Sequence, residues 1–187
     1  MRLWRKEPAT REGKYLVELR GKVFPHPCMV LGGRDPAAPE AIRSYARAVS
    51  ATGVGGLLGL ADGGWSVTRR DGTKPDWPFV VLRADDVNAS AALSVYADAC
   101  EEAGMDPLYC SDLRALVDDF IDHALANGAE PESSGPGFVG PYVASLERLA
   151  LSFEEFLSAS GAGDPDGPRH RRDDPATVEK MRSGRCA

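Results

Sequence analysis

The residues with the clearest chemistry in this sequence are three cations beside a tryptophan. Arg69, Arg70 and Lys74 lie close together, and Trp77 follows on a loop stiffened by two prolines. Arginine side chains bind phosphates and carboxylates, and an exposed indole can stack a base or anchor a protein interface. We therefore predict a ligand- or partner-binding surface at these four residues. The structural alternative is that Trp77 closes the end of the core while the cations protect an edge strand.

A second basic cluster lies near the end of the sequence, at Arg169, His170, Arg171 and Arg172. Two aspartates follow it directly and offset part of its charge. We predict this cluster as a secondary candidate for binding an anion or an acidic partner. A tail whose own charges pair with one another is the alternative.

The spacing of the histidines and cysteines does not indicate a metal site or a catalytic set. His26 and Cys28 lie two positions apart, but a structural zinc site needs four ligands and no CxxC or HxxxH pair supplies the others. His123 belongs to an aspartate-rich helix, a pattern typical of a solvated helix face. The glycines from Gly53 to Gly59 match neither common nucleotide-binding motif. We predict no metal, no cofactor and no catalytic residue, with an uncharacterised enzyme as the least favoured alternative.

An internal repeat contains the first cationic cluster. The segment 64–104 aligns without a gap to the segment 13–53, and 12 of 41 positions are identical. A constant offset across strand, turn and helix positions predicts a duplicated supersecondary unit. In each copy two short apolar runs precede a helical pattern, which predicts a β-hairpin followed by a helix. The predicted strands are Lys14–Arg20 and Cys28–Leu31 in the first copy, and Trp65–Arg70 and Phe79–Arg83 in the second.

The predicted fold class is α+β, with two tandem ββα repeats forming a small antiparallel sheet covered by helices, plus two further amphipathic helices. Because a single hairpin is marginal in water, the two hairpins should join into one four-stranded sheet or pack as a pseudo-symmetric pair. Tyr45 and Tyr96, at matching positions on the repeat helices, are predicted to be core residues. The predicted divisions are an N-terminal arm at 1–12, repeats at 13–53 and 64–104 joined by a glycine-rich connector at 54–63, a helix at 105–128, a linker at 129–140, a helix at 141–159 and a tail at 160–187, with 13–159 as one compact domain.

The composition limits the classes of partner. The chain has 187 residues, with 22 Lys and Arg against 28 Asp and Glu, so its net charge is −6. This charge repels nucleic acids and anionic membranes, so we expect neither non-specific nucleic-acid binding nor membrane binding. No apolar run approaches the roughly 18 residues of a membrane span. Four scattered cysteines and the lack of an N-terminal export pattern lead us to expect a soluble, cytoplasmic protein with reduced thiols.

Three stretches of the chain carry a resemblance: RRDGTKPDWPFVVL at 69–82, SVYADACEEAGMDPLY at 94–109 and GDPDGPRHRRDDPATVEKM at 163–181. They resemble a group of small uncharacterised proteins found in phage and prophage genomes of GC-rich bacteria. The resemblance implies a mobile-element origin and carries no enzymatic activity. The first copy of the repeat and the predicted helix from Pro141 are additions to that pattern.

These observations lead to a functional prediction. We expect a phage or mobile-element interaction protein that binds a host or viral macromolecule, a role that would include inhibition of a host defence system. The alternative is a protein that binds or sequesters a small nucleotide or another anionic ligand.

Overall fold

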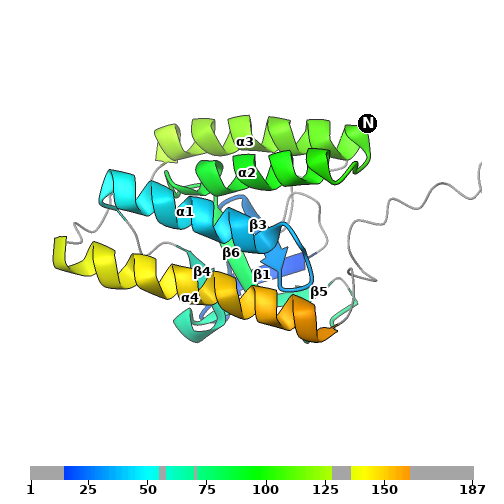
Figure 1. Cartoon of the computed structure of the whole chain (residues 1–187), viewed down its shortest axis with the longest axis horizontal. Helices are drawn as coiled ribbons and strands as arrows, with labels where there is room; N and C mark the ends of the chain where they lie inside the picture. The colour runs from blue at the N-terminus through cyan, green and yellow to red at the C-terminus, as the bar shows by residue number, and fades with distance from the viewer. Residues whose placement is uncertain (1–14, 55–57, 70, 128–135, 161–187) are drawn as a thin grey trace, which may run out of the picture.

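The computed structural model describes residues 15–54, 58–69, 71–127 and 136–160 (Figure 1). The strands are β1 (Tyr15–Leu19), β2 (Lys22–Val23), β3 (Cys28–Gly32), β4 (Gly59–Leu60), β5 (Trp65–Arg69) and β6 (Phe79–Arg83). The helices are α1 (Ala38–Thr52), α2 (Ala89–Glu102), α3 (Pro107–Asn127) and α4 (Pro136–Ser160), with a short 3-10 helix η1 (Ala61–Gly63) before β5. The predicted α+β class is confirmed.

The strands form two three-stranded antiparallel sheets, in the order β2-β1-β5 and β3-β6-β4. In the first sheet Val17 lies opposite Val67, and in the second Val30 lies opposite Val81. The prediction of a hairpin within each segment is therefore wrong, because β1 and β3 lie in different sheets and each pairs with a strand of the other segment. The proline-rich loop at 24–27 explains the separation, since a proline cannot donate the hydrogen bond that a continued ladder needs.

The β3–β6 pair forms the middle layer of the molecule and is covered on both faces. Along β3, Met29 and Leu31 belong to the core under the helices. Cys28 and Val30 belong to a second core shared with β1 and β5. This alternation follows from the two-residue period of a strand, and burial on both faces explains why β3 and β6 are almost continuously apolar.

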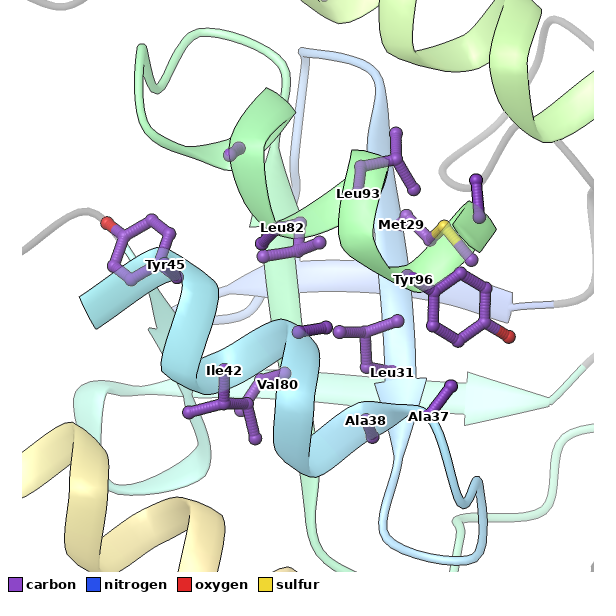
Figure 2. Packing of buried hydrophobic residues seen from close by; sticks show 14 of the residues in the cluster. Met29, Leu31, Ala37, Ala38, Ile42, Tyr45, Val80, Leu82, Leu93 and Tyr96 are labelled. Atoms are coloured by element: carbon purple, nitrogen blue, oxygen red, sulfur yellow. The ribbon is translucent and has the colours of Figure 1, made fainter. Parts of the chain in front are cut away.

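The helices form one layer over the β3–β6 sheet, in the spatial order α3, α2, α1, α4 (Figure 1). α1 and α2 contact each other and lie on the sheet, while α4 packs on α1 and α3 packs on α2. In Figure 2 the side chains of Leu31, Val80 and Leu82 point from the strands toward the helix layer. They pack in one cluster with Ile42 and Leu93 of the two inner helices. Within the part of the chain that is described, none of the helices is long and apolar enough to cross a membrane.

Two predicted boundaries differ from the structure. The connector at 54–63 contains β4, which pairs with β6, and η1. Gly59 permits this pairing because a Cβ atom there would lie 2.8 Å from the Trp65 ring and from the Val81 Cβ. α4 begins at Pro136 instead of Pro141, so the predicted linker at 129–140 is too long. Pro141 lies inside the helix, where it cannot donate the usual backbone hydrogen bond.

Two backbone hydrogen bonds between the first and second segments are equivalent: their donors are 51 positions apart, and so are their acceptors. Gly33 donates its N–H to the carbonyl of Pro78 at 2.6 Å, and Ala84 donates to the carbonyl of Pro27 at 2.9 Å. The β3–β6 register has the same property, because Val30 faces the residue 51 positions after it. Each proline loop is therefore fixed by the end of the strand that belongs to the other segment.

Candidate functional site

Trp77, the aromatic residue of the predicted surface, is buried in the structure. Only 7% of its surface is exposed, and its ring meets the Tyr15 ring edge-on, with centroids 6.0 Å apart. A Cβ atom at Gly32 would lie 2.9 Å from the indole, so a glycine is what lets the ring pack there. The expectation of an exposed indole is corrected: Trp77 closes one end of the core between the two sheets.

The cations predicted beside Trp77 are placed only in part. Lys74 is exposed, and Arg69 is half-buried on β5. Arg70 and the basic cluster at 169–172 lie outside the described residues. The same loop also carries carboxylates: Asp71 accepts hydrogen bonds from the Thr73 hydroxyl at 2.6 Å and backbone N–H at 2.8 Å, and these bonds lower the Asp71 pKa. The described part of the loop is therefore of mixed charge.

A polar cluster that the sequence did not predict lies at the opposite end of the β3–β6 pair. His26, on the loop before β3, has its Nδ1 3.2 Å from Nε2 of His123 on α3. The other nitrogen of His26, Nε2, lies 3.9 Å from the Asp85 carboxylate. Arg83, the last residue of β6, holds that carboxylate by donating from Nε at 2.9 Å and from a terminal nitrogen to the second oxygen. We call His26, Arg83, Asp85 and His123 the histidine cluster.

Two aromatic rings lie against Arg83 of the histidine cluster. The Arg83 guanidinium lies 5.1 Å from the Phe24 ring centroid and 5.9 Å from that of Trp65. Cations are attracted to the faces of such rings, and the attraction strengthens as water is excluded. Phe24 also meets the His26 ring at 5.4 Å. Arg83 is thus fixed between a carboxylate and two aromatic rings, and it orients Asp85 toward His26.

The chemistry open to the histidine cluster is proton sharing between imidazoles. Cys28, which the sequence analysis considered beside His26, is buried between the two sheets. Among the described residues, no group of three or more His, Cys, Asp or Glu side chains could hold a metal ion. Because His26 and His123 are 97 positions apart, no local pattern indicates their contact.

Two buried tyrosines bind aspartates of the opposite segment. The Tyr45 hydroxyl donates to Asp86 Oδ2 at 2.5 Å, and the Tyr96 hydroxyl donates to Asp35 Oδ2 at 2.6 Å. Burial raises the pKa of Asp86, although the hydrogen bond from Tyr45 opposes the rise. Burial also raises the pKa of both phenols, and the neighbouring carboxylates add to the rise. The predicted core positions of Tyr45 and Tyr96 are confirmed.

The outer side of α3 carries large apolar side chains in contact with solvent. Ile121 is 42% exposed and Leu125 83%, while Leu108, 71% exposed, lies in the first turn of the helix, about 20 Å from Ile121 along the axis. Ile121 and Leu125 are four residues apart and so are neighbours on the helix surface. The carboxylates of Asp118 and Asp122, also exposed, lie beside them. α3 packs on α2 through its opposite side, which carries Leu113, Leu116 and Phe120.

Comparisons with protein-family models, with curated proteins and with solved structures found no match.

Proposed function

We propose that this chain is a small interaction protein of phage or mobile-element origin that binds a host or viral protein through the outer side of α3. The proposal is carried by one observation, the exposure of the neighbouring side chains Ile121 and Leu125 on α3. Single exposed apolar residues are ordinary, but adjacent large ones on a solvent-facing helix are typical of a surface that another protein covers. Mobile-element origin is supported by the sequence resemblance alone.

Charge defines the partner further. Asp118 and Asp122 flank the apolar pair Ile121 and Leu125, and the whole chain has a net charge of −6. A complementary surface would present an apolar pocket bordered by lysine or arginine, because like charges oppose association and opposite charges accelerate it. The proposed partner is therefore a protein with a locally basic surface.

The alternative of a small nucleotide or anion ligand has less support. It depended on an indole available for stacking, and Trp77 is packed against Tyr15 and Gly32. The cations that remain, Arg69 and Lys74, share their loop with Asp71 and Asp76. Asp76 itself binds Arg34 at 2.8 Å.

The test compares two variants with matched chemistry. Ile121→Asp combined with Leu125→Asp removes the apolar pair, while Leu151→Asp on α4 is the control, because Leu151 is also exposed, at 51%. The partner is first identified by co-purification from host extract and then titrated as a purified protein. Burial of each of the two side chains contributes about 1.5 to 3 kcal/mol, so the double variant should lose roughly a hundredfold or more in affinity. Equal affinity of the double variant and the control would contradict the proposal.

We further propose that the segments 13–53 and 64–104 are copies of one unit related by an approximate two-fold axis. Support comes from the contacts that occur twice at the offset of 51: the two loop bonds of Gly33 and Ala84 and the two tyrosine–aspartate bonds. A two-fold axis generates such reciprocal contacts. If residue i of the first segment contacts residue j of the second, then the equivalent of i in the second segment contacts the equivalent of j in the first.

Separate fragments test the duplication. Because β3 pairs only with β6 among the described strands, and β1 has only the two-residue β2 as a partner in its own segment, fragments 1–56 and 57–187 should each fail to fold alone and should fold together when mixed. Circular dichroism and size-exclusion chromatography of the fragments and the mixture measure this. Independent folding of either fragment would be the contrary result.

A further inference from the structure

The two ends of the β3–β6 pair are built from different chemistry at matching positions. His26 and Trp77 are 51 residues apart, and each precedes a proline whose carbonyl accepts a hydrogen bond from the other segment. At one end Trp77 is buried, and Phe156 of α4 packs against the same core. At the other end the His26 side chain is 34% exposed and meets His123 of α3.

Stability alone explains the Trp77 end but not the His26 end. Burial of an indole and a phenyl ring contributes several kcal/mol. An imidazole pair with a nearly buried carboxylate, Asp85 at 4% exposure, must first compensate for the loss of water. Residues that depart from the pattern favoured by stability are commonly kept for function.

The hydrogen-bond geometry determines how many protons the pair can hold. A neutral imidazole has one N–H donor and one acceptor nitrogen. With the Asp85 carboxylate near Nε2 of His26, that nitrogen is best placed to carry the proton, and Nδ1 then accepts from Nε2 of His123. The contact therefore needs His26 Nδ1 to be without a proton, or the reverse arrangement in which His123 is the acceptor.

Carboxylates lie near both rings of the pair, and the geometry of the contact has room for one added proton but not for two. Asp85 lies beside His26 and is itself paired with Arg83. On α3, Asp119 lies one turn before His123 and Asp122 is its neighbour in sequence. With one added proton, the imidazolium still donates to the other ring, which keeps an acceptor nitrogen. A second proton would place two N–H donors face to face across 3.2 Å with no acceptor between them.

We propose that the contact between His26 and His123 is a proton-controlled attachment of the C-terminal half of α3 to the loop before β3, and that it regulates the α3 binding surface. The regulatory consequence rests on the proposed function of α3, whereas the attachment itself does not. Above the pH at which both imidazoles are protonated, His123 holds the turn that carries Ile121 and Leu125. Below it, the attachment opens and that turn moves away from the loop.

Amide hydrogen exchange of the full chain tests the attachment without any partner. An unperturbed imidazole titrates near pH 6.5, so exchange is measured at about pH 7.5 and about pH 5.0 and corrected for the intrinsic pH dependence of exchange. On acidification, the protection of the amides at 120–127 should fall by roughly tenfold or more, while the protection of the α1 amides should be unchanged. Equal protection at both pH values would overturn the proposal.

Two variants assign the effect to the histidines. His123→Phe replaces the imidazole with a phenyl ring like that of Phe156, which binds no proton. In this variant the protection of the α3 amides should be independent of pH across this range. His26→Gln is the second variant, and it should remove the pH dependence through the other partner. A pH-dependent loss of protection that persists in either folded variant would refute the assignment. Failure of the Asp variants at Ile121 and Leu125 to weaken partner binding would refute the binding surface but leave this result standing.

Discussion

Removal of a single hydroxyl should cost more at Tyr45 than at Tyr96, although both tyrosines are buried and both bind a carboxylate. In Tyr45→Phe the ring still fills its place, so the loss falls on the bond to Asp86 and on the interaction of the hydroxyl with Tyr142. In Tyr96→Phe the loss falls on the bond to Asp35, on a contact at 3.3 Å with the Tyr109 hydroxyl and on the interaction with Cys100.

The two acceptors differ in their access to water. Asp86 is 2% exposed, so water cannot replace the lost donor, and within the described residues its carboxylate keeps the bond from the backbone N–H of Asn88 at 2.9 Å. Asp35 is half-buried, and water can take the place of the Tyr96 hydroxyl. A hydrogen bond to a charged buried group contributes about 1.5 to 3 kcal/mol, and an ordinary one about 1 kcal/mol. We expect losses of about 2 to 3 kcal/mol for Tyr45→Phe and about 1 kcal/mol for Tyr96→Phe.

Urea unfolding near neutral pH, with equal dependence on denaturant in all variants, measures both losses. The pH dependence gives a second readout at Asp86. Because its pKa is raised on folding, the folded state binds this proton more tightly than the unfolded state. The free energy of unfolding contributed by Asp86 therefore falls as pH rises from the ordinary aspartate range through the raised pKa. Asp86→Asn should remove that slope. A Tyr96→Phe loss equal to or larger than that of Tyr45→Phe would refute the argument from water access.

Three further predictions each concern the surroundings of a single residue. Gly33→Ala should destabilise the protein by about 1 to 3 kcal/mol, measured by urea unfolding, because a Cβ atom would lie 2.5 Å from the Pro78 ring; an unchanged midpoint would contradict that close approach. Cys100, whose pKa burial raises to about 12, should resist iodoacetamide near pH 8 in the folded protein and react after unfolding, as mass spectrometry would detect. Lys74→Ala should change stability by less than about 0.5 kcal/mol because the side chain is exposed, and a larger shift of the melting temperature would point to an unrecognised contact.

Local pattern was sufficient to place most of the elements. The apolar run at 79–83 is β6 with the predicted bounds, and α1 ends where Gly53 adopts a left-handed φ of 73°. Such features depend on a few neighbouring residues, so the sequence contains them. Strand pairing does not have this property: a hairpin was the expected partner choice for β1 and β3, but both pair with strands of the other segment.

The candidate site was less predictable than the fold, for a related reason. The prolines and cations near Trp77 in the sequence predict an exposed indole. It is buried by contacts with Tyr15 and Gly32, which are distant in the sequence. His26 and His123 have no local feature that connects them, because one lies on a loop and the other on a helix. Exposure on α3 was also unpredictable at Ile121, which fits an apolar face by spacing yet is 42% exposed.

The exchange of strands between segments also affects how this chain folds during synthesis. Val30 leaves the ribosome 51 residues before Val81, the residue that it faces in the β3–β6 ladder. At about 5 to 20 residues per second, β3 waits several seconds for its partner. During that interval only the short β1–β2 pair can form locally among the described strands, and the apolar residues of β3 remain without their sheet. A nascent chain of this design should therefore depend on chaperones that shield short apolar strands, and its yield should rise when translation through the second segment is fast.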